Sequence, residues 1–169
     1  MNSPTYGTVS MDEIAAIIKS KVENDSGEFN IMIGTDSQNF HETKMVIVIA
    51  LHHVGHGGLF FYEESTVRRI TNVKEKLLHE TSLSLEYAQQ LLDAFDRLKE
   101  DTGFDYQKHV NFSIHVDAGY NGPSSQAIPD VVGWIKACGY EAVIKPTSYA
   151  ACSIANKYSK PYPAMDKAS

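Results

Sequence analysis

The fold is decided by one stretch of the sequence, Phe29-Asn30-Ile31-Met32-Ile33-Gly34-Thr35-Asp36-Ser37-Gln38. It predicts an apolar strand that ends on the carboxylate of Asp36, with Gly34 leaving room for a ligand to approach the backbone. One aspartate at the end of a strand is a weak sign of a functional site. The sign becomes strong only if carboxylates from other parts of the chain reach the same place.

The composition of the chain is typical of a soluble globular protein, with 43% hydrophobic and 21% charged residues. Its 169 residues predict one domain over 1–169, with loose ends at about 1–9 and 160–169. No run approaches the roughly 18 apolar residues of a membrane span, and the start lacks the pattern of a signal peptide. The two cysteines, Cys138 and Cys152, suit a reducing compartment, so we expect a cytoplasmic protein without a membrane partner.

The charge balance limits how the chain can meet nucleic acid. Its net charge of −6 comes from 15 Lys and Arg residues against 21 Asp and Glu residues. This argues against a protein that coats nucleic acid by charge alone. An enzyme that reaches phosphates through metal ions remains compatible with it, because the metals supply positive charge.

Periodicity and turn residues predict an α/β fold. Ser10 is a good N-cap for a helix over roughly 11–24. Three strands joined by short turns then form an antiparallel meander, at 29–37, 44–53 and 59–63. Helices and strands alternate after it, at about 72–100, 110–117, 125–138, 140–145 and 148–158. We therefore expect a five-stranded mixed sheet with helices packed on it.

Three carboxylates can meet in this arrangement. Asp36 and Asp117 end strands that a helical crossover makes parallel neighbours, and Glu80 lies on the border of the inward face of the long helix. Each alone is more often an ordinary strand-end or surface residue. Together they cannot all stay ionised unless a cation lies among them. Oxygen ligands of this kind favour Mg²⁺ or Mn²⁺, which can support phosphodiester cleavage.

Four segments carry a resemblance to a known family. They are Gly34-Thr35-Asp36-Ser37-Gln38, His79-Glu80-Thr81-Ser82-Leu83-Ser84, His115-Val116-Asp117-Ala118-Gly119 with Asn121-Gly122, and Lys145-Pro146-Thr147-Ser148-Tyr149-Ala150-Ala151. From about residue 10 to residue 160 the chain resembles the YkuK-like family of predicted ribonuclease-H-related proteins. The resemblance implies a ribonuclease-H-like fold. It also implies that Asp36, Glu80 and Asp117 match the first three acidic positions of a metal site.

The last helix departs from the family pattern. The family places a further Asp in a Val-Ala-Asp stretch, and the matching stretch here is Ile154-Ala155-Asn156. Asn156 offers one neutral oxygen, so it would be a weak fourth metal ligand. The usually acidic position after Lys145-Pro146 is Thr147 here. A site with less negative charge holds a second metal less well, so we expect catalysis to be weaker, to rely on Mn²⁺, or to be lost.

Two functions from different classes follow. The first is a Mg²⁺- or Mn²⁺-dependent nuclease acting on RNA or DNA, in which Ser37 and Gln38 position substrate or water. Lys145 and Ser148 would contact the nucleic acid. The alternative is a catalytically weakened module that binds nucleic acid, a nucleotide or a protein partner without turnover. The oligomeric state stays open.

Histidines offer a rival metal site. His52, His53 and His56 lie close together in the sequence, but adjacent strand residues face opposite sides, so a structural role is favoured. His115 shares a strand face with Asp117 and is either a proton shuttle near the site or a packed residue.

Overall fold

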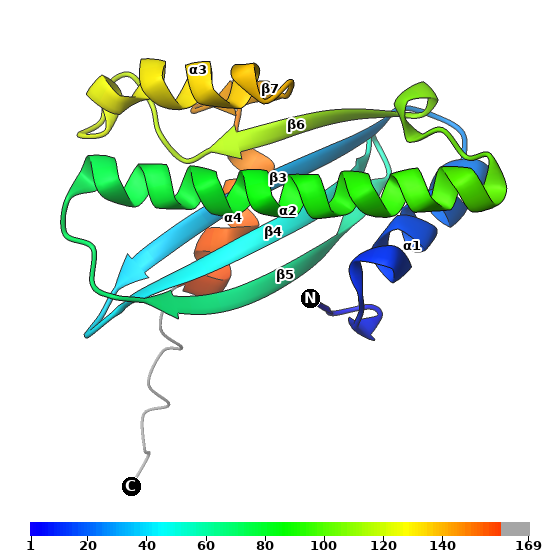
Figure 1. Cartoon of the computed structure of the whole chain (residues 1–169), viewed down its shortest axis with the longest axis horizontal. Helices are drawn as coiled ribbons and strands as arrows, with labels where there is room; N and C mark the ends of the chain where they lie inside the picture. The colour runs from blue at the N-terminus through cyan, green and yellow to red at the C-terminus, as the bar shows by residue number, and fades with distance from the viewer. Residues whose placement is uncertain (160–169) are drawn as a thin grey trace, which may run out of the picture.

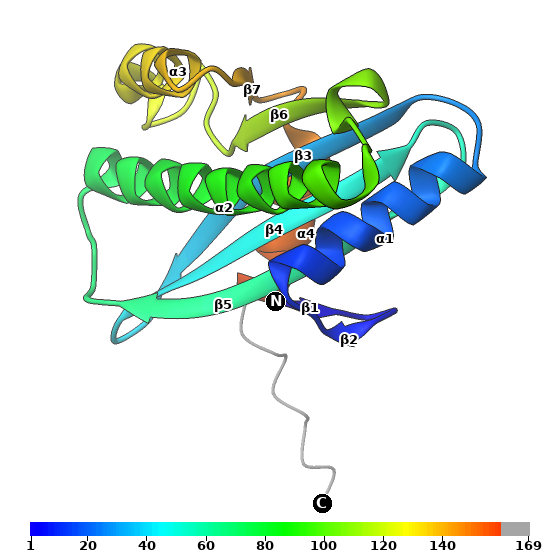
Figure 2. The ribbon, with the colours of Figure 1, turned by 45° about the vertical axis from the view of Figure 1, so that its right-hand side comes forward.

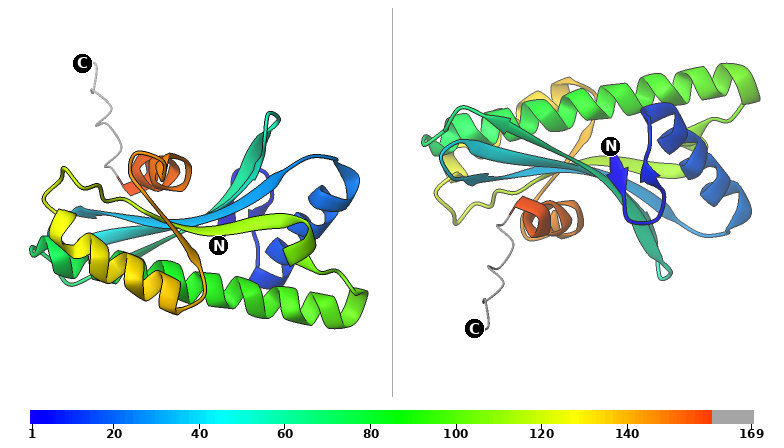
Figure 3. Two further views of the ribbon diagram at one scale, coloured as in Figure 1. Left: turned by 90° about the horizontal axis from the view of Figure 1, so that it is seen from above. Right: turned by 90° about the horizontal axis from the view of Figure 1, so that it is seen from below.

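The computed structural model describes residues 1–159, apart from the side chains of residues 149–152. The loose tail expected at about 160–169 lies outside the described residues. The elements, in chain order, are β1 (Asn2–Ser3), β2 (Gly7–Thr8), α1 (Met11–Asn24), β3 (Phe29–Asn39), β4 (Thr43–His53), β5 (Gly57–Val67), α2 (Val73–Thr102), η1 (Tyr106–Lys108), β6 (Val110–Val116), η2 (Ser125–Ala127), α3 (Ile128–Ala137), β7 (Glu141–Ile144) and α4 (Tyr149–Ser159). Helices α1, α2 and α3 cover one face of the sheet, and α4 covers the other (Figures 1 and 3).

The strand order of the sheet over residues 1–159 is β2-β1-β5-β4-β3-β6-β7. Strands β3, β4 and β5 pair antiparallel, which confirms the predicted meander. Strand β6 pairs parallel with β3 and with β7, so the sheet is mixed as expected. No described helix is both long and apolar enough to cross a membrane.

The prediction of five strands is wrong, because the described residues form seven. The segment expected to be a loose start forms a small hairpin, β1 and β2, which pairs with β5 opposite Tyr62 (Figure 2). Gly7, at φ 72°, lies at the turn of this hairpin, and the N-terminal ammonium of Met1 donates a hydrogen bond of 2.9 Å to the Val9 carbonyl. Strands of two residues are too short to show any hydrophobic period, so the sequence could not reveal them.

Local sequence signals explain the two long helices. Ser10 and Glu13 form a capping box at the start of α1. The side chain of Asn72 accepts a hydrogen bond from the Glu75 amide at the start of α2, and Gly103 ends α2 in the left-handed conformation. These residues satisfy backbone groups that helix ends otherwise leave unpaired.

Hydrophobic residues on both faces of the sheet hold the layers together. The larger core lies between the sheet and α1, α2 and α3, and includes Ile33, Leu91 and Ile114. The smaller core lies under α4, where Val46 and Val48 of β4 pack with Ala155. Strand β4 therefore supplies buried residues to both faces, as its continuous apolar run predicts.

Helix α4 is fastened to the sheet near its C-terminal end. The ammonium of Lys44 donates to the Tyr158 carbonyl at 2.7 Å and pairs with Glu64 at 3.1 Å. The ring of Tyr158 stacks on Tyr62 with centroids 4.3 Å apart. These contacts fix which residues of α4 lie over β3.

Thr43 holds the segment between β5 and α2 in place. Its fully buried hydroxyl accepts the Ile70 amide at 2.8 Å and donates to the side chain of Asn39 at 2.7 Å. The Asn39 amide group in turn donates to the Ile70 carbonyl at 2.8 Å. This closed set of hydrogen bonds ties the end of β3 to the segment that enters α2.

We predict that Thr43→Val destabilises the protein by about 1–3 kcal/mol, because it leaves the buried Ile70 amide without an acceptor. Urea unfolding measures the change. The matched control is Thr66→Val, at an exposed position of β5, which should change stability by less than about 0.5 kcal/mol. Equal stability of the two variants would contradict the assigned role of Thr43.

Candidate functional site

The candidate site lies where β3 and β6 separate. The two strands pair in parallel from Phe29 and Val110 up to Gly34 and His115, which confirms that they are neighbours. Asp36 and Asp117 each follow the last pair by two residues. Because the carboxyl ends of parallel strands meet at the same edge, both aspartates arrive at the opening between the strands.

Carboxylates reach this opening from both faces of the sheet. The hydroxyl of Ser37 donates to Glu80 of α2 at 2.5 Å, and both residues are buried. Its neighbour Asp36 points to the other face, where it accepts a hydrogen bond from the hydroxyl of Ser159 of α4 at 2.7 Å. Adjacent strand residues face opposite sides, so Ser37 and Asp36 link the site to two different helices. The prediction that Glu80 turns inward is confirmed.

Burial dominates the electrostatics of Glu80. Loss of solvent raises the pKa of this carboxyl from 4.5 to about 8, while the hydrogen bond from Ser37 lowers it in part. The negative charge of Asp36, and to a lesser extent that of Asp117, raises the pKa further. Glu80 is therefore protonated at neutral pH in this structure.

Asp36 shares this environment. Burial raises its pKa above the ordinary value, and the Ser159 hydrogen bond acts in the opposite direction. The charge of Asp117 also raises this pKa, while the ammonium of Lys76 lowers it. The three carboxyls thus act on one another electrostatically, as expected for groups gathered at one site.

Asp117 has a cationic partner. The ammonium of Lys145 lies 2.6 Å from its carboxylate, and the two side chains are 54% and 21% exposed, respectively. The Lys145 amide also donates to the Ala118 carbonyl at 2.9 Å, which ties the end of β7 to the loop after β6. Lys145 therefore lies beside Asp117 with its charge directed at that carboxylate, and its role in binding substrate stays a prediction.

The other residues expected to bind substrate or metal differ in how far they are exposed to solvent. Gln38 is half-buried on β3. Asn156 is half-buried on α4, and its main-chain carbonyl accepts a hydrogen bond from the Ser159 hydroxyl at 3.1 Å. Ser148 is fully buried at the start of α4, which leaves its hydroxyl no surface to offer to a substrate. The position of Ser148 therefore does not favour the predicted contact with nucleic acid. Ser37 is also buried, and its hydroxyl contacts Glu80, so it acts on the site by holding that carboxyl.

Two residues of the site were missed in the sequence. Lys76 lies one helical turn before Glu80, and its charge lowers the pKa of both Glu80 and Asp36. The spacing of four residues on a predicted helix is a signal that could have identified it. Ser159 carries no such signal, because its contact with Asp36 depends on how α4 lies across the sheet.

The donor chemistry of the site fits a hard divalent cation, but the ligand set is not assembled. Within residues 1–159, no three acidic, histidine or cysteine side chains form a group that could hold a metal ion. Each of the three carboxylates instead contacts a protein group, namely Ser159, Ser37 or Lys145. Burial, and after it repulsion between carboxylates, raises the pKa values of Asp36 and Glu80, and a cation bound nearby would relieve that repulsion.

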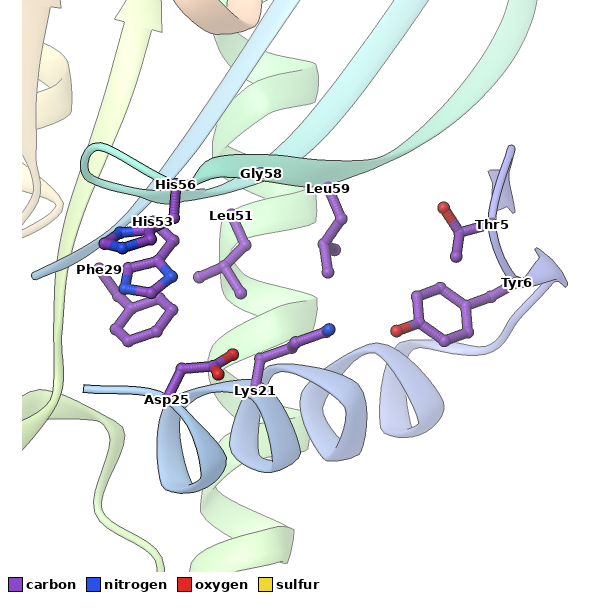
Figure 4. A pocket seen from close by; sticks show the side chains of 10 residues that line it. All are labelled: Thr5, Tyr6, Lys21, Asp25, Phe29, Leu51, His53, His56, Gly58 and Leu59. Carbon is purple, nitrogen blue, oxygen red and sulfur yellow. The ribbon is translucent and has the colours of Figure 1, made fainter. Parts of the chain in front are cut away.

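His53 and His56 lie at the end of the sheet opposite to the carboxylate site. His53 is stacked between Phe29 and His56, with centroids 4.2 and 4.3 Å away, and its Nε2 lies 2.9 Å from the Ser26 carbonyl. These rings border a pocket of about 370 Å³ (Figure 4). Stacked rings direct their nitrogens sideways, so they do not converge on one ion. Phe29 and Asp36 are seven residues apart on β3, roughly 23 Å, so this pocket is separate from the carboxylate site.

His115 is a packed residue. It is buried, its Nε2 lies 3.0 Å from the Ser113 hydroxyl, and burial lowers its pKa. A neutral, buried imidazole fits the structural interpretation of His115 better than the proton shuttle.

The buried Glu80 predicts a pH-dependent stability. The folded protein keeps this proton up to about pH 8, whereas the unfolded chain releases it near 4.5, so stability falls as pH rises between these values. Glu80→Gln removes the titration and keeps an acceptor for Ser37. We expect it to be more stable than the wild type at high pH, by on the order of 3 kcal/mol, and similar to it in acid.

Urea unfolding across this pH range measures the effect. Glu86→Gln, at an exposed position of the same helix, is the matched control and should leave the pH slope unchanged. If Glu80→Gln and the wild type have parallel pH profiles, Glu80 does not carry a raised pKa.

Comparisons with known proteins agree with this architecture. The family model described as "Ribonuclease H-like" matches residues 11–160. The chain is also 33% identical over 160 residues to "Uncharacterized protein YkuK" of Bacillus subtilis (strain 168), an overlap of 90% of this chain and 92% of that protein. No solved structure matches the chain at a significant level. The matched range of the family model contains all three carboxylates.

Proposed function

Because the chain belongs to the ribonuclease H-like family and, within it, to the YkuK-like proteins, we propose that it is a metal-dependent nuclease that hydrolyses phosphodiester bonds of RNA or DNA. One observation supports the proposal: Asp36 and Asp117 each lie two residues beyond the last β3–β6 pair, and the charges of both raise the pKa of the Glu80 carboxyl. The low cysteine count supports a cytoplasmic setting for this activity.

In this proposal, Asp36, Glu80 and Asp117 hold Mg²⁺ or Mn²⁺, and Asn156 adds a weak neutral oxygen. The bound ion would activate a water and stabilise the leaving oxygen. On the α2 side of the sheet, the hydroxyl of Ser37 holds the carboxyl of Glu80 in place. On the α4 side, the hydroxyl of Ser159 does the same for Asp36.

Positive charge at the site comes from two lysines. Lys145 neutralises Asp117 before substrate arrives, and its half-exposed ammonium is within reach of a phosphate oxygen that approaches that carboxylate. Lys76 moderates the charge of Asp36 and Glu80 from α2. Gln38 lies at the same end of β3, where it can orient substrate or water.

The second candidate function is a weakened module that binds nucleic acid, a nucleotide or a protein partner without turnover. Two observations favour it. Asn156 adds no charge to the site, and Lys145 already pairs with one of the three carboxylates. Both reduce the attraction of the site for a divalent cation.

We predict that purified protein cleaves RNA or DNA with Mg²⁺ or Mn²⁺ and that Asp36→Asn lowers the rate by about 100-fold or more, because the variant loses a charged metal ligand. Gel assays with single strands, duplexes and RNA–DNA hybrids, with and without chelator, measure this. Asp96→Asn, at an exposed position of α2, is the matched control. Cleavage that survives Asp36→Asn would remove Asp36 from the site.

We predict that Asn156→Asp increases affinity for Mn²⁺ by about tenfold, since a fourth carboxylate adds a charged ligand near Asp36. Calorimetric titration of Mn²⁺ measures the affinity, and cleavage at limiting Mn²⁺ measures its effect on rate. Asn24→Asp adds the same charge at the end of α1, remote from the site, and should change neither. Tighter Mn²⁺ binding without any cleavage would favour the module over the nuclease.

A further inference from the structure

Tyr120 is the most exposed large hydrophobic side chain in the described part of the chain. It is 70% exposed, whereas Tyr6, Phe40 and Trp134 are about 40% exposed. A single exposed aromatic is common on protein surfaces and says little by itself. Its placement is what makes it informative.

Tyr120 borders a hollow that opens directly beside the carboxylate site. The hollow measures about 550 Å³ and is lined by the loop from Asp117 to Ser124 and by Lys145 and Pro146. Two of its lining residues, Asp117 and Lys145, form the ion pair of the candidate site. The volume lies in the range of ordinary small-ligand pockets, which span roughly 300–1,000 Å³.

The loop that carries Tyr120 is held by its backbone. The Gly122 amide donates to the Gly119 carbonyl at 3.2 Å, and the Lys145 amide donates to the Ala118 carbonyl at 2.9 Å. A side chain at Gly119 would place its Cβ 3.3 Å from that of Lys145, so glycine allows the loop to lie close against this residue. The backbone is therefore fixed on both sides of Tyr120, while the ring itself remains in solvent.

We propose that Tyr120 is a stacking platform for an unpaired nucleobase, and that the site accepts single-stranded nucleic acid. An aromatic ring stacks on any base, whatever the sequence, and each stacked base adds about 1–3 kcal/mol of binding free energy. Bases inside a duplex have both faces covered by their neighbours, so only an unpaired base can lie on the ring. A base on Tyr120 would place its phosphate next to Lys145 and Asp117.

The charge of the protein favours stacking as the source of affinity. With a net charge of −6, the chain gains little affinity for the phosphate backbone from its overall charge. Lys145 is already paired with Asp117 and offers only local attraction. The inference rests on the proposed function for the bond that is cleaved, but binding of the base is measured without cleavage.

The test uses the full chain and a single-stranded oligonucleotide of about eight nucleotides that carries one 2-aminopurine. The wild type should quench the fluorescence of this base by stacking. Tyr120→Ala should abolish the quenching and weaken binding about tenfold, whereas Tyr120→Phe should retain both. Tyr6→Ala, which removes an exposed tyrosine from the remote pocket of Figure 4, is the matched control and should behave as the wild type.

Two results would overturn the inference. One is quenching by Tyr120→Ala equal to that of the wild type, and the other is binding of a blunt duplex as tight as binding of the single strand. The outcome is separable from that of the nuclease proposal. Quenching that depends on Tyr120 without metal-dependent cleavage would overturn the nuclease and support the platform. Cleavage that is equal in the wild type and Tyr120→Ala, without such quenching, would overturn the platform alone.

Discussion

The arrangement of the site depends on the end of the pairing between β3 and β6. Beyond Gly34 and His115, β3 remains paired only with β4, up to Asn39. If the pairing had continued, a hydrogen-bonded sheet would lie between the α2 side and the α4 side of the molecule. The pairing instead ends before Asp36, and the negative charge of Asp36 on one side of the sheet raises the pKa of Glu80 on the other.

Protein groups satisfy the hydrogen-bonding capacity of the carboxylates at the site. Hydroxyl groups of Ser37 and Ser159 donate hydrogen bonds to Glu80 and Asp36, but a hydroxyl carries no net charge. Hydrogen bonding therefore satisfies the oxygen lone pairs without removing the repulsion between the groups. Protonation of Glu80 removes part of that repulsion instead.

The sequence predicts much of this arrangement because its main features are local. Caps, periodicity and turn residues define the long elements, and the crossover through α2 makes β3 and β6 parallel neighbours. The angular position of Glu80 on α2 was likewise sufficient to predict that it faces inward.

Other features depend on tertiary contacts that no local pattern encodes. The contact of Ser159 with Asp36 follows from the fastening of α4 by Lys44, a residue 115 positions earlier in the chain. Burial of Ser148 follows from the same docking, since its sequence context indicates a helix cap but not the side that faces the sheet. The hairpin of β1 and β2 is likewise visible only through its pairing with β5.

In the proposed binding mode, charge and stacking would each contribute to the recognition of nucleic acid. Asn156 in place of an acidic residue, together with the pairing of Lys145 with Asp117, leaves the site with little excess charge of either sign to attract a highly charged polymer. A ring such as Tyr120 gives affinity that does not depend on charge and is therefore little affected by salt. Since the ring lies on the same loop as Asp117, binding of a base and placement of its phosphate are coupled by a short, fixed segment of backbone. The proposed platform would thereby let a protein with a net charge of −6 bind nucleic acid at one place by stacking.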